Sequence, residues 1–279
     1  MMTLNNLCCG HYGKGFMNNI VTFFKNIKKY NKYAVRSAKA ELKSEVSDSY
    51  LNWLWWILEP VCFMLIYTFV FGVVFHNDTP FFASFVLVGL TVWDFFSRMV
   101  TGSVRLIINN RGLVTKVYIP KYVLLLSKSY TYLFKAFISL SIALCLMIIQ
   151  GVHFSYHVIY VIPILMTMYI FTFGVSLLLM HFGVLLNDLA NLTRIGLKMV
   201  FYLSGVFYSI TDRLSGVLCH ILLNWNPVAF LMNELRNAFL YNVNPNFIGL
   251  ALWLTAGLIL CVIGINIIHK NENSYAKAI

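Results

Sequence analysis

Residues 53–75, with the sequence WLWWILEPVCFMLIYTFVFGVVF, decide the fold class of this chain. Glu59 is the one charged residue among them. A helix rises about 1.5 Å per residue, so about 20 apolar residues are enough to cross the hydrocarbon core of a membrane, which is about 30 Å thick. The stretch therefore predicts a membrane-spanning α-helix.

The rest of the 279-residue chain repeats this pattern. It is 59% hydrophobic and only 11% charged, whereas a soluble domain is about 25% charged. Six runs are long enough to cross a membrane, near residues 54–75, 80–100, 129–150, 158–186, 195–211 and 246–268. Lys135 and Lys198 fall inside the third and fifth runs, and we expect their amines to extend toward the membrane surface. The composition predicts an all-α integral membrane protein with six transmembrane helices and excludes a soluble enzyme.

The basic residues indicate how the chain is oriented. Lys and Arg outnumber Asp and Glu by 21 to 10, and they gather in residues 14–43 and 98–135, whereas the connections 76–79 and 151–157 contain none. Cytoplasmic loops of membrane proteins carry an excess of Lys and Arg. The pattern predicts that both termini are cytoplasmic, and it is better explained by contact with membrane lipids than by nucleic-acid binding.

The residues before the first span predict an amphipathic helix. Between Ile20 and Val46, apolar residues recur at steps of three and four, opposite a basic face that includes Lys39 and Lys43. Such a helix lies in the membrane interface, where it either anchors the chain to anionic lipid or docks a partner. We therefore divide the chain into a cytoplasmic tail with an interface helix (1–50), a transmembrane domain (51–268) and a cytoplasmic tail (269–279).

The region between the fifth and sixth spans holds two apolar pieces that are too short to cross. They run from Leu214 to Leu223 and from Val228 to Tyr241, and Asn224–Pro227 separates them. Pieces of ten to fourteen residues reach roughly half to two-thirds of the way through the core. They predict a re-entrant helix pair on the outer side of the membrane, the alternative being a loop that lies on the lipid surface.

The sequence lacks the residues of a self-sufficient enzyme. The phosphate-binding pattern GxxxxGK[ST] is absent, so we expect no ATPase site and no cofactor in this chain. His153 and His157 have the spacing of a metal pair but no nearby Cys, Asp or Glu, so we expect no metal. Asp94 and Arg98 are one helical turn apart, and we expect them to form an intramembrane ion pair. A carrier usually keeps an unpaired carboxylate near the midplane for its coupling ion, and the sequence offers no clear candidate, which disfavours an ATP-independent carrier.

Aromatic residues mark the first span. Trp53 and Trp56 stand at its start, and Tyr67, Phe71 and Phe75 follow at four-residue steps, which places them on one face of the helix. Flat aromatic faces suit sugar rings, so this stripe is a candidate glycan pathway. Packing against lipid explains the same stripe, and the sequence leaves both interpretations open.

Three stretches resemble the permease subunits of type-2 ABC exporters, in particular those that move lipid-linked polysaccharides such as O-antigen, capsule and teichoic acid. Residues 50–60 and 64–72 resemble the start of the first span in that family. Residues 110–120 (NRGLVTKVYIP) resemble its cytoplasmic coupling segment. Asn226-Pro227 with Glu234-Leu235-Arg236 resembles its outer re-entrant region. The resemblance covers about 220 residues, from the interface helix to the sixth span.

The resemblance implies a bacterial cytoplasmic-membrane homodimer above two ATPase subunits, which bind the ATP and Mg²⁺. It implies that the segment before the third span and the interface helix transmit ATP-driven closure. Gly112 would end a short helix there. The expected coupling residues are Arg105, Arg111, Gly112, Lys116, Pro120, Lys39 and Lys43.

The outer region is the expected gate of this exporter. Its residues would be Trp225, Asn226, Pro227, Glu234 and Arg236, with the last two facing the glycan exit or, alternatively, capping a surface helix. Two other functions compete with polysaccharide export. One is a type-2 ABC permease for a drug or a small lipid, and the other is an ATP-independent carrier or membrane transferase.

Overall fold

The computed structural model describes residues 5–47, 50–76, 79–117, 119–213, 216–272 and 274–275. All secondary structure within these ranges is helical. Five helical segments in the described part are long and apolar enough to cross a membrane. They are Trp55–Val74 (α2, Trp55–Tyr67, with the π-helical η2, Thr68–Val74), Phe82–Val104 (α3), Lys121–Ile149 (α6), Tyr156–Leu185 (η3, Tyr156–Tyr160, with α7, Val161–Leu185) and Phe247–Lys270 (α12). The chain is therefore a multi-pass membrane protein.

The prediction for the fifth span differs most from the structure. We expected a span at residues 195–211, but the helix here is α8, Leu189–Leu203, with 15 residues. It stops because Gly205 takes a positive φ of 64°, which ends a right-handed helix. By its length, α8 does not belong to the five long spans.

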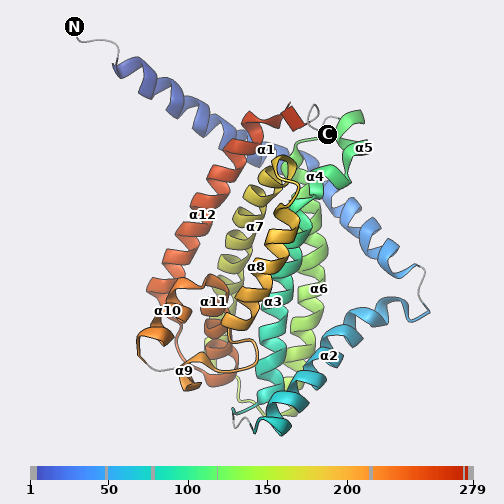
Figure 1. Cartoon of the computed structure of the whole chain (residues 1–279), viewed down its shortest axis with the longest axis vertical. Coiled ribbons are helices and arrows are strands. Elements are labelled where there is room, and N and C mark those ends of the chain that lie inside the picture. Colours follow the sequence, from blue (N-terminus) through green and yellow to red (C-terminus); the bar gives the residue numbers. More distant parts are fainter. Residues whose placement is uncertain are drawn as a thin grey trace.

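The two ends of the helix bundle are distinct (Figure 1). Two short helices, α4 (Leu106–Asn109) and α5 (Arg111–Lys116), lie at the upper end, which we call the α4–α5 end. The short helices α9 (Ile210–Arg213) and α10 (Val217–Trp225) lie toward the opposite end, which we call the α9–α10 end. The N-terminal helix α1 (Asn5–Val46) crosses the α4–α5 end and begins earlier than the expected Ile20.

Helix α3 occupies the centre of the bundle, and most of its side chains are buried against α6, α7 and α11. Helix α7, which packs on α3, also packs closely against α12. A Cβ atom at Gly174 would lie 2.9 Å from the Cys261 backbone nitrogen, and one at Gly257 would lie 2.9 Å from the Phe171 Cα atom. Small residues of this kind let two membrane helices bring their backbones together.

The last described residues fold back onto the bundle. The Tyr275 ring is buried, and its hydroxyl lies 2.7 Å from Nδ1 of His181 on α7. Burial raises the pKa of the Tyr275 phenol, so this hydroxyl keeps its proton at neutral pH. Tyr275, in the expected C-terminal tail, is thus held against α7.

Between α8 and α12 the chain forms short helices, as predicted. They are α9, α10, α11 (Pro227–Arg236) and the π-helical η4 (Asn237–Tyr241), and the break between the two main pieces falls at Asn226. Most side chains of α11 are buried against α3 and α7. This helix is therefore part of the protein core, and it is not a loop exposed on the outside of the bundle.

Candidate functional site

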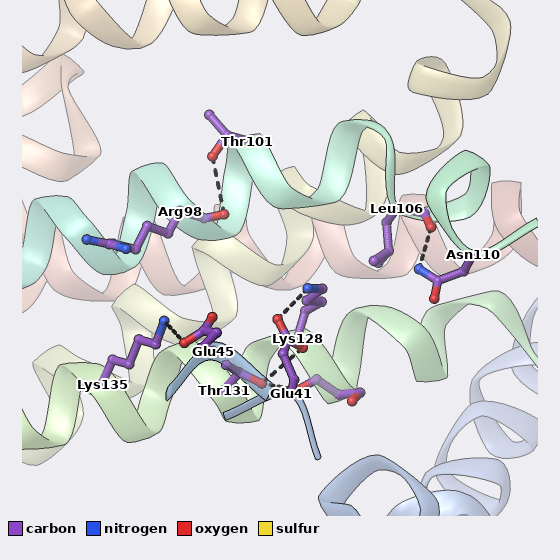
Figure 2. Close-up of polar contacts among 10 residues, drawn as sticks. Glu41, Glu45, Arg98, Thr101, Leu106, Asn110, Lys128, Thr131 and Lys135 are labelled. Carbon is purple, nitrogen blue, oxygen red and sulfur yellow. Dashed lines mark hydrogen bonds and ion pairs between the residues drawn. The ribbon is translucent and has the colours of Figure 1, made fainter. Parts of the chain in front are cut away.

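Two ion pairs attach the N-terminal helix α1 to the span α6. Lys128 pairs with Glu41, and the Lys135 amine lies 2.6 Å from Oε2 of Glu45. Figure 2 shows both carboxylates pointing from α1 toward these two lysines. The Thr131 hydroxyl, between the lysines, donates to Glu41 as well. Lys135 is thus neutralised by a partner and does not merely extend toward the membrane surface.

The sequence analysis missed these pairs, although the spacing contains a signal. Glu41 and Glu45 are four residues apart, and Lys128 and Lys135 are seven apart, so each couple lies on one face of its helix. Two acidic residues on one amphipathic helix, matched by two basic residues inside an apolar run, would have predicted this docking.

The expected ion pair between Asp94 and Arg98 is not the one that forms. Arg98 pairs with Glu59 on α2, and among the described residues no ion pair involves Asp94. Asp94 lines the same pocket between α2, α3 and α6, together with Glu59 and Lys135. The prediction considered only neighbours on one helix, whereas the long Arg98 side chain reaches a carboxylate on an adjacent span.

The segment between α3 and α6 forms a compact turn at the α4–α5 end. Arg105 donates from Nη2 to the Asn187 carbonyl oxygen, at 3.2 Å, so it joins this segment to the chain just before α8. Helix α4 ends at Asn110, whose side chain donates to the Leu106 carbonyl oxygen at 2.8 Å. The prediction that Gly112 ends a helix is therefore wrong, because Gly112 lies inside α5.

Gly112 has open space beside it. A Cβ atom built at this position meets no atom within 4 Å. Nothing inside the described chain therefore requires a glycine at position 112. Any such requirement has to come from a surface that docks onto α5.

The remaining coupling candidates lie on α5, on α1 and at the start of α6. Arg111 and Lys116 are exposed on α5, and Lys39 and Lys43 are exposed on α1. Pro120 is buried directly before the first residue of α6, with a φ of −55°. A proline is well suited to this position because its fixed φ is compatible with the start of a helix. The structure thus exposes basic side chains on both α5 and α1.

The aromatic stripe of α2 and η2 is continuous but only partly exposed. Tyr67 and Phe71 pack against Phe207, with ring centroids 4.1 Å and 4.9 Å apart, and Phe71 also stacks on Phe75 at 5.5 Å. The Phe75 ring is exposed. The stripe therefore forms the contact between the first span and the turn that follows α8.

The two tryptophans at the start of the first span differ in exposure. Trp53 is exposed, whereas Trp56 is half-buried against Phe134 of α6 at 5.4 Å between centroids. Of the two, Trp53 is free to contact lipid or a ligand, while Trp56 contributes to helix packing.

Arg236 is enclosed by the protein, so the expectation that it faces an exit is wrong. Its guanidinium donates to the carbonyl oxygens of Phe85, Gly205 and Val206, at 3.1, 2.9 and 2.8 Å. It also lies 3.4 Å from the centroid of the Phe85 ring. A guanidinium has five N–H donors, which lets one side chain satisfy several carbonyls of the irregular turn after α8.

Glu234 is also buried, and it too does not face an exit. Its carboxylate accepts a hydrogen bond from the Asn246 backbone nitrogen at 3.0 Å, next to the start of α12. The alternative interpretation, in which both residues cap a surface helix, is also wrong because α11 lies in the core. These residues hold the α9–α10 end together.

Asn226 and Pro227 start helix α11. Oδ1 of Asn226 accepts from the backbone nitrogens of Val228 and Ala229, and its amide donates to the Ser204 hydroxyl at 2.8 Å. Asn226 is thus a helix cap that also fixes the end of α8, and Pro227 occupies the first helical position. Trp225, directly before them, is exposed.

No group of three potential metal ligands was found among the described residues. His157 is buried and stacks on Tyr156, with ring centroids 4.1 Å apart. The carbonyl oxygen of His153 accepts a hydrogen bond from Asn242. The two histidines therefore contribute to packing at the connection between α6 and α7.

Comparison with known proteins identifies several relatives that match most of the chain. No protein-family model matches. The O-antigen export system permease protein RfbA of Klebsiella pneumoniae is 26% identical over 241 residues, which cover 85% of this chain and 91% of the relative. RfbA of Myxococcus xanthus is 26% identical over 260 residues, 93% of this chain and 100% of the relative. The polysialic acid transport protein KpsM of Escherichia coli is 24% identical over 236 residues, 77% of this chain and 90% of the relative. The resemblance to the permease subunits of type-2 ABC exporters, first seen in three sequence stretches, is therefore confirmed over most of the chain.

Proposed function

We propose that this chain is the permease subunit of an ATP-driven ABC exporter that moves a lipid-linked polysaccharide across the bacterial cytoplasmic membrane. The observation that carries the proposal is the match to O-antigen export permeases over 85% to 93% of the chain. The five long apolar helices supply the membrane-embedded structure that such a subunit needs. This permease subunit has no ATPase site of its own, and a separate subunit of the exporter binds ATP and Mg²⁺.

The chain crosses the membrane six times, and α8 makes the additional crossing. The start of α7 and the start of α12 lie at the same end, because the Tyr160 and Phe247 rings are 5.3 Å apart. Helix α7 runs to the opposite end, where Gly183 contacts Val104. The chain must therefore return across the bundle between α7 and α12, and α8 is the helix available (Figure 1). An even number of crossings leaves both termini on the same side of the membrane, and the distribution of Lys and Arg makes that side the cytoplasm.

The α4–α5 end faces the cytoplasm and receives the ATPase subunits. The exposed cations Lys39, Lys43, Arg111 and Lys116 provide a basic surface for acidic partner residues. Two copies of the chain and two ATPase subunits form the complete exporter, and the substrate passes between the two permease copies.

The ion pairs between α1 and α6 transmit the motion. When ATP binding draws the ATPase subunits together, they displace α1 and α5. Because Glu41 and Glu45 hold α1 to Lys128 and Lys135, this displacement is passed to α6. Helix α6 packs on α3, the central helix, so the inner half of the bundle moves with it.

The α9–α10 end contains the outer gate. Helices α10 and α11 form the re-entrant pair, and the buried side chains of α11 satisfy the condition that irregular backbone at membrane depth be surrounded by protein. Within this gate Trp225 is the exposed residue, whereas Asn226, Glu234 and Arg236 hold its frame. Trp53 and Phe75 are the exposed aromatic residues available to contact sugar rings.

Deletion of the gene tests the function. We expect the deletion strain to lose one surface polysaccharide and to accumulate its lipid-linked form inside the cell, as measured by glycan analysis of the envelope and of extracted lipids. Expression of the intact chain should restore export. A normal surface glycan profile combined with a changed tolerance to drugs would instead indicate a permease for small molecules.

A further inference from the structure

A cationic groove lies between α3 and α8, apart from the residues assigned above to coupling and gating. Its volume is about 440 Å³. Arg98 contributes from α3, and Arg194 and Lys198 contribute from α8. Trp93 of α3 and Tyr202 of α8 also line the groove and give it aromatic surface.

The charges of this groove are not balanced inside the chain. Arg194 and Lys198 are exposed, and the described part of the molecule offers neither of them an ion pair or a side-chain hydrogen bond. Arg98 pairs with Glu59, which lines a different pocket on the other side of Arg98. No carboxylate lines the groove itself. Arg98 thus has two carboxylates beside it, Glu59 and Asp94, whereas neither Arg194 nor Lys198 has an ion-pair partner among the described residues. The remaining positive charge favours an anion.

The position of the groove indicates that its ligand is embedded in the membrane. Lys198 lies nine residues after Leu189, the first residue of α8, which is about 13 Å along a helix. A neighbouring face of α8 exposes Leu192, Ile195 and Met199, which are apolar. An ionisable residue at such depth is costly unless an anion or water neutralises it, and such residues mark substrate pathways.

We propose that the groove between α3 and α8 binds the phosphate or diphosphate group of the carrier lipid to which the exported glycan is attached. This inference rests on the proposed function. Arg presents a fork of donors that matches phosphate oxygens, and Lys adds a compact charge. The headgroup of a bulk phospholipid stays at the membrane surface, so the depth of Lys198 favours a lipid that the exporter draws inward.

Direct binding measurements test the groove. The complete complex of the chain with its ATPase subunits is placed in lipid nanodiscs, and the affinity for a long-chain polyprenyl diphosphate is compared with that for the uncharged polyprenol of the same length. We expect Arg194→Gln and Lys198→Gln each to weaken binding of the diphosphate by about tenfold. Binding of the polyprenol should not change. Arg194→Lys should recover part of the affinity because it keeps the charge.

Controls separate a binding role from a structural one. Lys270→Gln removes an exposed lysine at the end of α12, far from the groove in the sequence, and should bind the diphosphate like the wild type. The thermal unfolding temperatures of all these variants should match, since the altered side chains are exposed. The proposal is overturned if both groove variants bind polyprenyl diphosphate as tightly as the wild type, or if phosphatidylglycerol displaces it equally well.

Export in cells distinguishes this proposal from the proposed function. If the intact chain restores surface polysaccharide to the deletion strain and the Arg194→Gln/Lys198→Gln double variant does not, both proposals are supported. If the double variant restores export as well as the intact chain, the groove proposal fails and the proposed function stands. If the deletion changes no polysaccharide, the proposed function fails.

Discussion

The charged residues at the two ends of the bundle are neutralised in different ways. At the α9–α10 end, Arg236 is sealed in the core and bonds to three backbone carbonyls, and Glu234 bonds to a backbone nitrogen. Nearer the α4–α5 end, Glu41, Glu45 and Glu59 pair with side chains of other helices, at partly exposed positions.

This difference separates contacts that keep the structure rigid from contacts that can rearrange as the helices move. A buried charge bonded to backbone has no alternative partner, and breaking its bonds leaves polar groups unsatisfied in an apolar core. An ion pair between two helices that is open to solvent contributes little stability and can be broken and re-formed as the helices move. We therefore assign the α9–α10 contacts to a rigid frame and the α1–α6 pairs to motion.

The largest predicted effect comes from removing the charge of Arg236. Arg236→Met should lower the free energy of unfolding by about 3 kcal/mol or more, because three carbonyl oxygens lose their donor inside the core. The measurement is unfolding of the purified protein in detergent. Arg194→Met, on the exposed face of α8, is the matched control and should change stability by less than about 0.5 kcal/mol. Similar values for the two variants would contradict the assignment of Arg236 to a frame.

The next effect concerns the cap of α11. Asn226→Ala should cost about 1 to 2 kcal/mol, because it removes the acceptor for two backbone nitrogens and the bond to Ser204. Asn226→Asp keeps the acceptor and loses only the amide donor, so it should cost less. The same unfolding measurement checks both. An equal loss of stability for Asn226→Ala and Asn226→Asp would show that the side-chain acceptor of the cap contributes nothing.

A smaller effect on stability is expected for the pair of Glu45 and Lys135. Its coupling free energy in a double-mutant cycle should be about 0.5 to 1 kcal/mol, because neither side chain is fully buried in the protein. Export should respond more strongly: Lys135→Glu should reduce it, and the exchange Glu45→Lys/Lys135→Glu should restore most of it. If the exchange variant exports no better than either single variant, this pair does not transmit motion.

Gly112 should have the smallest effect on stability and a clear one on coupling. Gly112→Val meets open space, so unfolding should change by less than about 1 kcal/mol. A branched side chain on α5 should, however, obstruct the docking of the ATPase subunit, so ATP hydrolysis should continue while export falls. Gly112→Ala, with its smaller side chain, is the control. Full export by Gly112→Val would exclude α5 from the coupling surface.

The apolar runs were sufficient to predict most of the fold. Four long helices closely match the expected residues, because a run of about 20 apolar residues has few alternatives to a spanning helix. The third, α6, begins at Lys121, earlier than its expected start at residue 129. The fifth run was misplaced because the positive φ of Gly205 ends α8, and hydropathy does not register backbone conformation.

The site residues were harder to predict, since sequence spacing reports neighbours on one helix only. Arg98 was assigned to Asp94 at a spacing of four, whereas its partner Glu59 is 39 residues away. The partners of Arg236 lie as far as 151 residues from it. A charged residue in an apolar run predicted that these residues have polar partners or a functional role. The packing of the helices determines which of them face one another.

We propose that this chain is the membrane channel of an exporter whose energy comes from a separate ATPase. Vesicles that contain the purified chain, with or without its ATPase subunits, and the lipid-linked glycan extracted from the deletion strain test this proposal. We expect the glycan to accumulate on the far side of the membrane only when the ATPase subunits and ATP are both present. Accumulation driven by the chain alone, without ATPase subunits or nucleotide, would contradict it.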